Sequence, residues 1–269
     1  MEPRVVIGIP HIGDLPDYFF KSVIGMRKGR DPYLVTVRNH PIDIARNLIV
    51  EAFKAQGDAT HLLMLDADMT FPADTLPRLL QLSEDLGAHV VSGTYFARSD
   101  TPVPHVYMFD NERDGVKYYR TLGPEFSAWL KAHPEHRDQG NESLFEPSPV
   151  KCDAVGAGVL LMTREVLDAV EEAHAESYKP WFECAPGSRG GEDFEFCRRV
   201  SALGYQVWAD FGLQCNHNAP GNFMGREEFI EAFAIGTEDE YDFVTPIVVE
   251  ISPDGRRRPR LPGREKVRA

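Results

Sequence analysis

The chain has few cysteines and no long apolar run. Its four cysteines (Cys152, Cys184, Cys197 and Cys215) show no CxxC pairing, which argues against a disulfide framework or a zinc ribbon and favours reduced thiols. No apolar stretch approaches the roughly 18 residues that a membrane span needs. The first residues lead straight into an expected strand, without the pattern of a signal peptide. These absences predict a cytoplasmic protein without a transmembrane segment.

Positive charge is sparse over most of the chain. Lysine and arginine number 29 against 42 acidic residues, and the net charge is −13. Residues 252–269 hold six arginines and one lysine against two acids, so this tail carries +5 and the rest carries −18. A tail rich in Arg, Pro and Gly is expected to be disordered. It could touch nucleic acid or an anionic membrane, but the acidic body should repel a polyanion.

Strand and helix patterns alternate along the chain. Pro41 opens a helix that Gly57 stops, and the other helices are expected at 73–86, 163–174 and 192–203. Strands are expected at 4–9 (ended by Pro10), 33–37, 61–65, 88–92, 154–162 and, as the last strand, 205–209. This order predicts an α/β fold with a doubly wound, mostly parallel sheet and helices on both faces. At 269 residues the chain can form one large α/β domain.

The middle of the chain departs from this pattern. Residues 94–150 contain several prolines, short β-like pieces at 105–109 and 116–121, and a polar stretch at 131–148. We interpret them as a small antiparallel or irregular insertion within a single catalytic domain that spans 1–251. Acceptor selection is expected there and in the loop at 177–191. Possible sugar or acceptor contacts are Tyr95, Arg98, Trp129 and Trp181, although core packing is the more usual role of each aromatic.

Two aspartates one residue apart, Asp66 and Asp68, follow the apolar run 61–65. In an extended strand, residues i and i+2 point to the same side, so both carboxylates can aim at one spot roughly 7 Å across. Ligands of such sheets collect beyond the carboxyl ends of the strands, and carboxylate oxygens suit Mg²⁺ or Mn²⁺. The alternative is that Asp66 caps a turn while Asp68 is a solvated loop residue. The spacing alone does not separate the two interpretations.

Arg46 and Asn47 open the helix that follows the strand at 33–37, and so belong at the same sheet edge. The helical step of about 100° per residue places Arg46 beside the apolar stripe and Asn47 nearly opposite it. Arg46 is therefore the better candidate to face a ligand, with a planar guanidinium suited to phosphate or to a base edge. A surface salt bridge with Asp43 is the alternative.

Three further features hold candidate site residues. Gly190 and Gly191 precede Glu192 and Asp193 at a helix start, where capping explains one acid and a general base explains the pair better. Glycines within the expected strand at 154–162 indicate either tight packing or a sugar-contacting wall, and the sequence does not decide between them. The late histidine His217 is a candidate metal ligand, although a lone histidine is usually structural.

The motifs occur in an order that resembles a GT-A-fold glycosyltransferase of the family 2 type. They are ARN at 45–47, LDAD at 65–68, GAGVLLM at 156–162, GEDFEFCRRVSALGY at 191–205 and then the late histidine. The resemblance covers residues 5–217 apart from the insertion. Two departures stand out: His11 occupies a position where many members have Thr or Ser, and the middle region has no clear donor-side aspartate.

The resemblance implies a GT-A fold and a metal-dependent transfer from a UDP-sugar to an acceptor hydroxyl, with inversion. It implies that Asp193, with Glu192 beside it, acts as the catalytic base. It implies Mn²⁺ or Mg²⁺ on the metal ligands Asp66, Asp68 and His217, and a nucleotide-sugar site formed by Pro10, Arg46, Asp66, Ala67 and Gly158.

Three alternatives stay open. A sugar nucleotidyltransferase usually needs a Gly-rich loop with a basic residue after the first strand, and residues 8–13 supply none. A non-catalytic nucleotide-sugar-binding module would not need Asp66, Asp68, Glu192 and Asp193 together. A phage-type enzyme that glycosylates modified nucleic-acid bases would suit the arginine-rich tail, but the acidic body argues against it.

Overall fold

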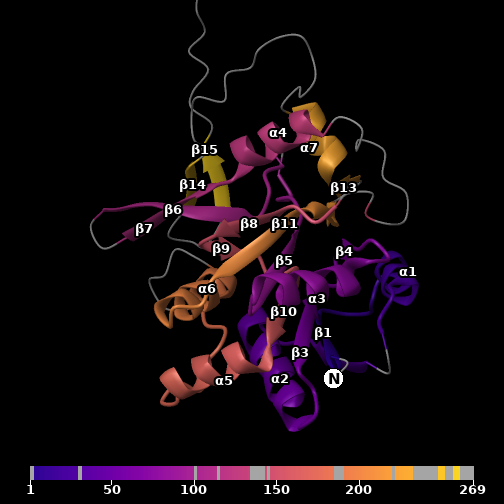
Figure 1. The fold of residues 1–269 in the computed structure, drawn as a ribbon, viewed down its shortest axis with the longest axis vertical. Helices are drawn as coiled ribbons and strands as arrows, with labels where there is room; N and C mark the ends of the chain where they lie inside the picture. The colour runs from indigo at the N-terminus through magenta and orange to yellow at the C-terminus, as the bar shows by residue number, and fades with distance from the viewer. Residues whose placement is uncertain are drawn as a thin grey trace, which may run out of the picture.

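A mixed sheet of seven strands forms the centre of the molecule in the computed structural model of the chain (Figure 1). The structure describes residues 3–29, 32–99, 102–113, 116–133, 143, 146–184, 191–219, 222–232, 248–251 and 257–260. In spatial order the strands are β2 (Tyr33–Arg38), β1 (Val5–His11), β3 (His61–Leu65), β10 (Val159–Thr163), β5 (Val90–Thr94), β11 (Val207–Gln214) and β8 (Pro149–Cys152). Five of them share one direction, and β10 and β8 run against it. The predicted α/β class with a mostly parallel sheet is confirmed.

Helices cover both faces of this sheet. They are α1 (Asp17–Gly25), α2 (Ile42–Ala55), α3 (Thr75–Leu86), α5 (Arg164–Ala173) and α6 (Glu192–Ala202). Side chains of α2, α5 and α6 share one core cluster, and those of α1 and α3 share the other. This is the doubly wound arrangement that the sequence predicted. Thr163 caps α5, as expected, by accepting a hydrogen bond from the Val166 backbone N–H.

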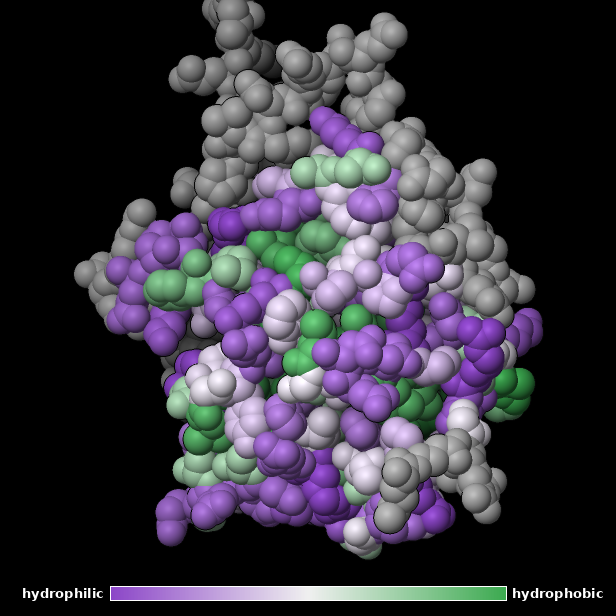
Figure 2. Space-filling model, in the orientation of Figure 1, coloured by the Kyte–Doolittle hydropathy of each residue, from purple (hydrophilic) through white to green (hydrophobic). Residues whose placement is uncertain are grey.

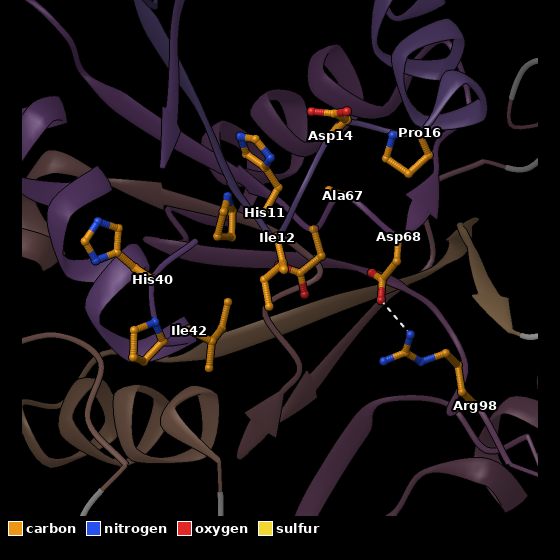
Figure 3. Close-up of a pocket in the computed structure, with 12 residues that line it drawn as sticks. His11, Ile12, Asp14, Pro16, His40, Ile42, Ala67, Asp68 and Arg98 are labelled. Atoms are coloured by element: carbon orange, nitrogen blue, oxygen red, sulfur yellow. Dashed lines mark ion pairs between the residues drawn. The ribbon is translucent and has the colours of Figure 1, made fainter. Parts of the chain in front are cut away.

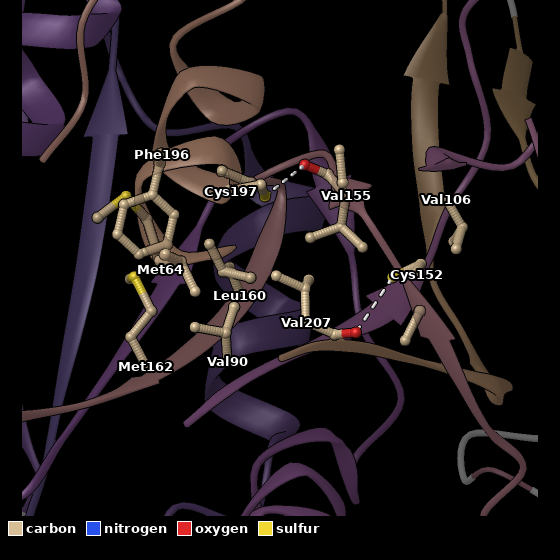
Figure 4. Close-up of a cluster of buried hydrophobic side chains, with 14 of the residues drawn as sticks. Met64, Val90, Val106, Cys152, Val155, Leu160, Met162, Phe196, Cys197 and Val207 are labelled. Carbon is tan, nitrogen blue, oxygen red and sulfur yellow. Dashed lines mark hydrogen bonds between the residues drawn. The ribbon is translucent and has the colours of Figure 1, made fainter. Parts of the chain in front are cut away.

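Strand β3 shows why the sheet separates these two layers. Its alternate residues point to opposite faces, so Leu62 and Met64 join the α2 side while Leu63 and Leu65 join the α1 side. All four have no exposed surface, and burial of each stabilises the fold by about 1.5–3 kcal/mol. Figure 4 shows Met64 among the apolar side chains packed beneath α6. The apolar run packs against helices on both faces and ends at Leu65, so Asp66 is the first residue after β3.

The prediction of one continuous strand at 154–162 is wrong. Residues 156–158 interrupt the strand. The first part, β9 (Ala154–Val155), belongs to another sheet, while β10 lies in the central sheet, antiparallel to β3 and β5. A Cβ built on Gly156 would lie 1.9 Å from the Tyr95 hydroxyl. The glycines therefore let Tyr95 approach the backbone, which is the tight-packing alternative.

Replacing Gly156 with alanine is expected to lower the free energy of unfolding by about 1–3 kcal/mol, because the methyl group has no space beside Tyr95. Chemical denaturation measures the loss. Gly57→Ala is the matched control, since nothing lies within 4 Å of a Cβ there. Equal stability for the two variants would contradict the packing role.

The insertion contributes to an antiparallel sheet beside the central one. In spatial order this sheet is β15 (Arg257–Arg260), β14 (Val248–Ile251), β7 (Val116–Thr121), β6 (Val106–Arg113) and β9. Helix α4 (Gly123–Ala132), which the sequence did not predict, packs Phe126 against Phe229 of α7 (Arg226–Ala232). The expected disorder of the tail is wrong for β15, which pairs with β14. The other tail residues lie outside the described part, as does much of the polar stretch at 131–148.

Two strand ends also differ from expectation. Strand β1 continues through Pro10 to His11 and stays paired with β2, while its pairing with β3 has already ended at Gly8. Pro10 therefore removes no donor that β3 needs. Strand β11 runs on to Gln214 and is followed by β12 (Asn216–Ala219) and β13 (Asn222–Met224), which form a small sheet with β4 (Met69–Thr70).

The face seen in Figure 2 is largely hydrophilic, with apolar residues in small separated groups. No helix within the described ranges combines the length and the apolar character needed to cross a membrane.

Candidate functional site

A cavity of about 560 Å³ opens at the carboxyl ends of β1 and β3 (Figure 3). Its lining comprises Pro10, His11, Ile12, Asp14, Pro16, His40, Pro41, Ile42, Asp66, Ala67, Asp68 and Arg98. Four residues predicted from sequence, Pro10, Asp66, Ala67 and Asp68, are thus brought together. In Figure 3, His40 and Ile42 lie at one end of the cavity and Asp68 with Arg98 at the other.

Asp66 is held at the first turn beyond β3. Its backbone N–H donates to the carbonyl oxygen of Gly158 at 3.0 Å. Arg46 Nη2 lies 3.0 Å from Asp66 Oδ1 and 3.1 Å from Oδ2, with hydrogen-bond geometry only to Oδ2. Oδ1 is buried and has no hydrogen bond in the described structure. Burial raises the pKa of Asp66, with Arg46 acting against it.

Arg46 is a buried connector and not a surface residue. Its side chain is 3% exposed, and it bonds Asp66, Glu192 (Nε to Oε1, 3.1 Å) and the Ala157 carbonyl oxygen (Nη1, 3.2 Å). The proposed salt bridge with Asp43 is wrong, because Asp43 pairs with Lys179 instead. Arg46 is also absent from the cavity lining. Its contact with a nucleotide stays a prediction, whereas its link between two candidate site acids is observed.

Asn47 is buried, although the helical step places it nearly opposite the apolar stripe. It is 4% exposed, and its amide donates to the backbone oxygens of Asp43 and Phe182. Its side-chain oxygen accepts from the Trp181 backbone N–H. The loop at 177–184 lies over this part of α2, so the side opposite the sheet is buried too.

Asp68 meets His217 across two strands of the small sheet. Strand β12 pairs with β4 so that His217 lies opposite Met69, and the Asn218 N–H donates to the Asp68 carbonyl oxygen at 2.7 Å. This register brings His217 Nε2 within 3.4 Å of Asp68 Oδ2. Burial alone would raise the pKa of Asp68, but His217 and Arg98 hold it below its ordinary value.

The second nitrogen of His217 defines the chemistry of this pair. Nδ1 lies 2.9 Å from the carbonyl oxygen of Phe96, which can only accept, so Nδ1 carries the proton. Nε2 then donates to the Asp68 carboxylate if the ring carries both protons, which is the form that lowers the pKa of Asp68, and it presents a lone pair to the carboxylate if the ring is neutral. Two acceptors that face each other repel unless a proton or a metal cation lies between them. A carbonyl that fixes the tautomer in this way is the usual second partner of a metal-binding histidine.

The residues present fit a divalent cation. Within the described ranges, no three His, Cys, Asp or Glu side chains are already gathered into a metal cage. However, Asp66 Oδ1 is buried without a hydrogen bond, and His217 Nε2 lies 3.4 Å from Asp68 Oδ2. Carboxylate oxygens with one imidazole suit Mn²⁺ or Mg²⁺, which complete their shells with water and ligand oxygens.

Glu192 and Asp193 begin α6, as predicted, behind the cavity. They are 8% and 6% exposed, and neither is among the described residues that line the cavity. Asp193 Oδ1 accepts from the Phe194 backbone N–H at 2.9 Å, which is a local helix-start bond. Burial, and then the neighbouring Asp193, raise the pKa of Glu192. Gly190 lies outside the described residues.

Gly158 occupies a packing position. A Cβ there would lie 2.4 Å from Met69 Sδ and 2.9 Å from Tyr95 Cζ. Its backbone N–H donates to the Tyr95 hydroxyl at 3.2 Å. Its predicted contact with the nucleotide stays a prediction, while its role in seating Tyr95 is observed.

Arg98, which the sequence offers as a possible acceptor contact, lies in the wall of the cavity. Its Nη1 lies 2.8 Å from Asp68 Oδ2, and nothing in the sequence signals this ion pair. The two residues are brought together by the loop after β5, and such loop geometry leaves no periodic signal. Tyr95 and Trp181, by contrast, serve the core as the sequence favoured, at 5% and 2% exposed.

Comparisons with known proteins give only distant similarities. No family model matches the chain. No curated protein matches its sequence. Among solved structures it is similar to A197 from STIV, with 16% identity, a TM-score of 0.49 and coverage of 99% of this chain and 98% of that one. It is also similar to GalNAc-T7 with UDP, GalNAc and Mn²⁺, with 14% identity, a TM-score of 0.47 and coverage of 81% of this chain and 44% of that one. Similarity at this level says nothing about activity.

Proposed function

We propose that this chain is a metal-dependent glycosyltransferase of the GT-A type. In this proposal it moves a sugar from a UDP-sugar to an acceptor hydroxyl with inversion. The cavity at the ends of β1 and β3 holds the nucleotide, with Pro10 and Ala67 on its wall. Its volume of about 560 Å³ is in the range of small-molecule sites. Asp66, Asp68 and His217 hold the cation beside the diphosphate.

The observation that carries the proposal is the pairing of Asp68 with a histidine fixed in its metal-binding tautomer. Asp68 and His217 are 149 residues apart, and only the β4–β12 pairing brings them together. With Nδ1 donating to the Phe96 carbonyl oxygen, Nε2 faces the carboxylate either as a donor in the doubly protonated ring or as a lone pair in the neutral ring. We assign the neutral ring, in which a cation would lie between Nε2 and the carboxylate.

Different residues of the chain have different roles in this proposal. A bound divalent cation would neutralise charge that develops on the leaving diphosphate. Arg46 holds Asp66 in place and favours its ionised form, opposing the burial that raises the pKa of Asp66. Asp193, at the start of α6, is the proposed base for the acceptor hydroxyl. Because it is 6% exposed and does not line the described cavity, the acceptor would approach it from outside that lining. The connection of Glu192 to Asp66 through Arg46 holds the start of α6 in register with the end of β3.

A binding experiment tests the donor class directly. Thermal unfolding is followed with UDP, GDP, CDP and ADP, each with and without Mn²⁺. UDP with Mn²⁺ is expected to raise the midpoint by about 5 °C or more at 100 times its Kd, because the ligand binds only the folded state. UDP without the cation should have little effect. Equal shifts for all four nucleotides, or shifts that ignore Mn²⁺, would refute the UDP and metal assignment. Binding without donor hydrolysis or transfer would indicate the non-catalytic alternative.

A further inference from the structure

Arg98 stands at the wall of the cavity as the cationic partner of Asp68 (Figure 3). It follows β5 by four residues. Its Nη1 lies 2.8 Å from Asp68 Oδ2, and the side chains of Arg98 and Asp68 are 48% and 33% exposed. An arginine with half its surface in water can leave a single carboxylate without being stranded in the interior.

The two arginines on the aspartate pair are held very differently. Arg46 is 3% exposed and bonds two carboxylates and a carbonyl oxygen. Removing it from those partners would leave buried charges unpaired, so it is a fixed element. Arg98 is held by an exposed ion pair, which is weak. Only Arg98 can therefore exchange its partner during a binding cycle.

Arg98 and a divalent cation would compete for Asp68 Oδ2. Asp68 Oδ2 forms the ion pair with Arg98 Nη1 at 2.8 Å and also lies 3.4 Å from His217 Nε2. A cation held by this oxygen and by His217 would lie within a few ångströms of the guanidinium, and like charges at that distance repel strongly. The Asp68 carboxylate therefore cannot bind Arg98 and the divalent cation favourably at the same time.

We propose that Arg98 is the counter-ion of Asp68 in the metal-free protein, that the divalent cation displaces it, and that the displaced guanidinium binds a phosphate oxygen of the nucleotide. The inference rests on the proposed function and deepens it. Arg98 already lines the cavity, and a guanidinium suits phosphate oxygens because its N–H groups form a planar fork. The exchange keeps Asp68 neutralised before the cation arrives and supplies a positive charge to the diphosphate afterwards.

Two titrations test this exchange. Free Mn²⁺ is followed by electron paramagnetic resonance in wild type, Arg98→Ala and the control Arg38→Ala. Arg38 pairs with Asp14 at 2.9 Å, so its loss removes one positive charge near the cavity without touching Asp68. Arg98→Ala is expected to bind Mn²⁺ roughly tenfold more tightly than wild type, because a competing cation is gone. Arg38→Ala should stay within about twofold.

The second titration uses UDP and uridine at saturating Mn²⁺. Arg98→Ala is expected to bind UDP roughly tenfold more weakly, the loss of one charge-assisted phosphate contact, with uridine affinity unchanged. Arg98→Lys should recover part of the UDP affinity, since the charge returns without the fork.

The outcomes separate the inference from the function beneath it. If wild type binds no Mn²⁺ saturably, the proposed function fails and the inference fails with it. If wild type binds Mn²⁺ but Arg98→Ala binds it no more tightly, the counter-ion role is overturned while the metal site stands. If UDP affinity is unchanged, or uridine affinity falls equally, the phosphate contact is overturned.

Discussion

Asp68→Ala is expected to abolish Mn²⁺-dependent transfer, with a loss of at least about 1,000-fold in kcat/KM, because the cation loses its most exposed carboxylate ligand. The expected loss corresponds to about 4 kcal/mol of transition-state stabilisation. Mn²⁺ binding should fall in parallel, and the measurement is donor hydrolysis or transfer alongside Mn²⁺ titration. The fold should tolerate the change, since Arg98 is half-exposed and His217, the buried second partner, keeps its bond to the Phe96 carbonyl oxygen.

Asp58→Ala is the matched control for this experiment. Asp58 also forms an exposed ion pair, with Arg4 at 2.7 Å, but it lies before β3 and away from the cavity. It should leave both Mn²⁺ binding and turnover unchanged. Undiminished activity of Asp68→Ala would remove the metal assignment, and so would an equal loss in Asp58→Ala.

Asp193→Asn is expected to retain UDP and Mn²⁺ binding within about twofold and yet to lose about 10²–10⁴-fold in kcat, the contribution of a general base. The substitution preserves shape, and the amide oxygen can still accept from the Phe194 N–H as the carboxylate does. A purely structural role at the helix start would therefore lose little. Single-turnover kinetics separates the chemical step from binding.

Glu195→Gln provides the comparison on the same helix. Glu195 pairs with Arg198 and Arg199 at 2.6 and 2.9 Å, so its change perturbs α6 without altering the acids at its start. Its kcat should stay near that of wild type. Full transfer by Asp193→Asn would place the base elsewhere, and Glu192 would be the next carboxylate to test.

Local sequence signals predicted the central framework well. The run 61–65 matched β3 residue for residue, because its four consecutive apolar residues are typical of a strand buried on both faces and Asp66 marks its end. The helices at 73–86 and 192–203 were found to within two residues, since an amphipathic stripe and a following glycine mark such elements. The position of the cavity follows from the end of β3, because the cavity is lined by the residues directly after that strand.

What the sequence could not predict depends on contacts between distant segments. The burial of Asn47 comes from the loop that holds Trp181, and the pairing of His217 with Asp68 comes from a two-residue strand, β4. The turn at Gly156–Gly158 was hidden because a continuous apolar stretch on both sides of it has the pattern of one strand. Periodicity describes one element at a time, and none of these features belongs to one element.

The reversed direction of β10 has a consequence for how the protein could diversify. Strand β5 ends at the cavity edge with Thr94, and β10, its antiparallel neighbour, starts at that edge with Val159. The residues between them leave the central sheet and rejoin it at adjacent points, so their number does not set the alignment of β3, β10 and β5. The part of that excursion between Arg98 and its one strand beside β11 can be lengthened or exchanged without moving Asp66, Asp68 or Arg98. Under the proposed function, new acceptors could be recruited in this way while the residues proposed to bind the donor stay unaltered.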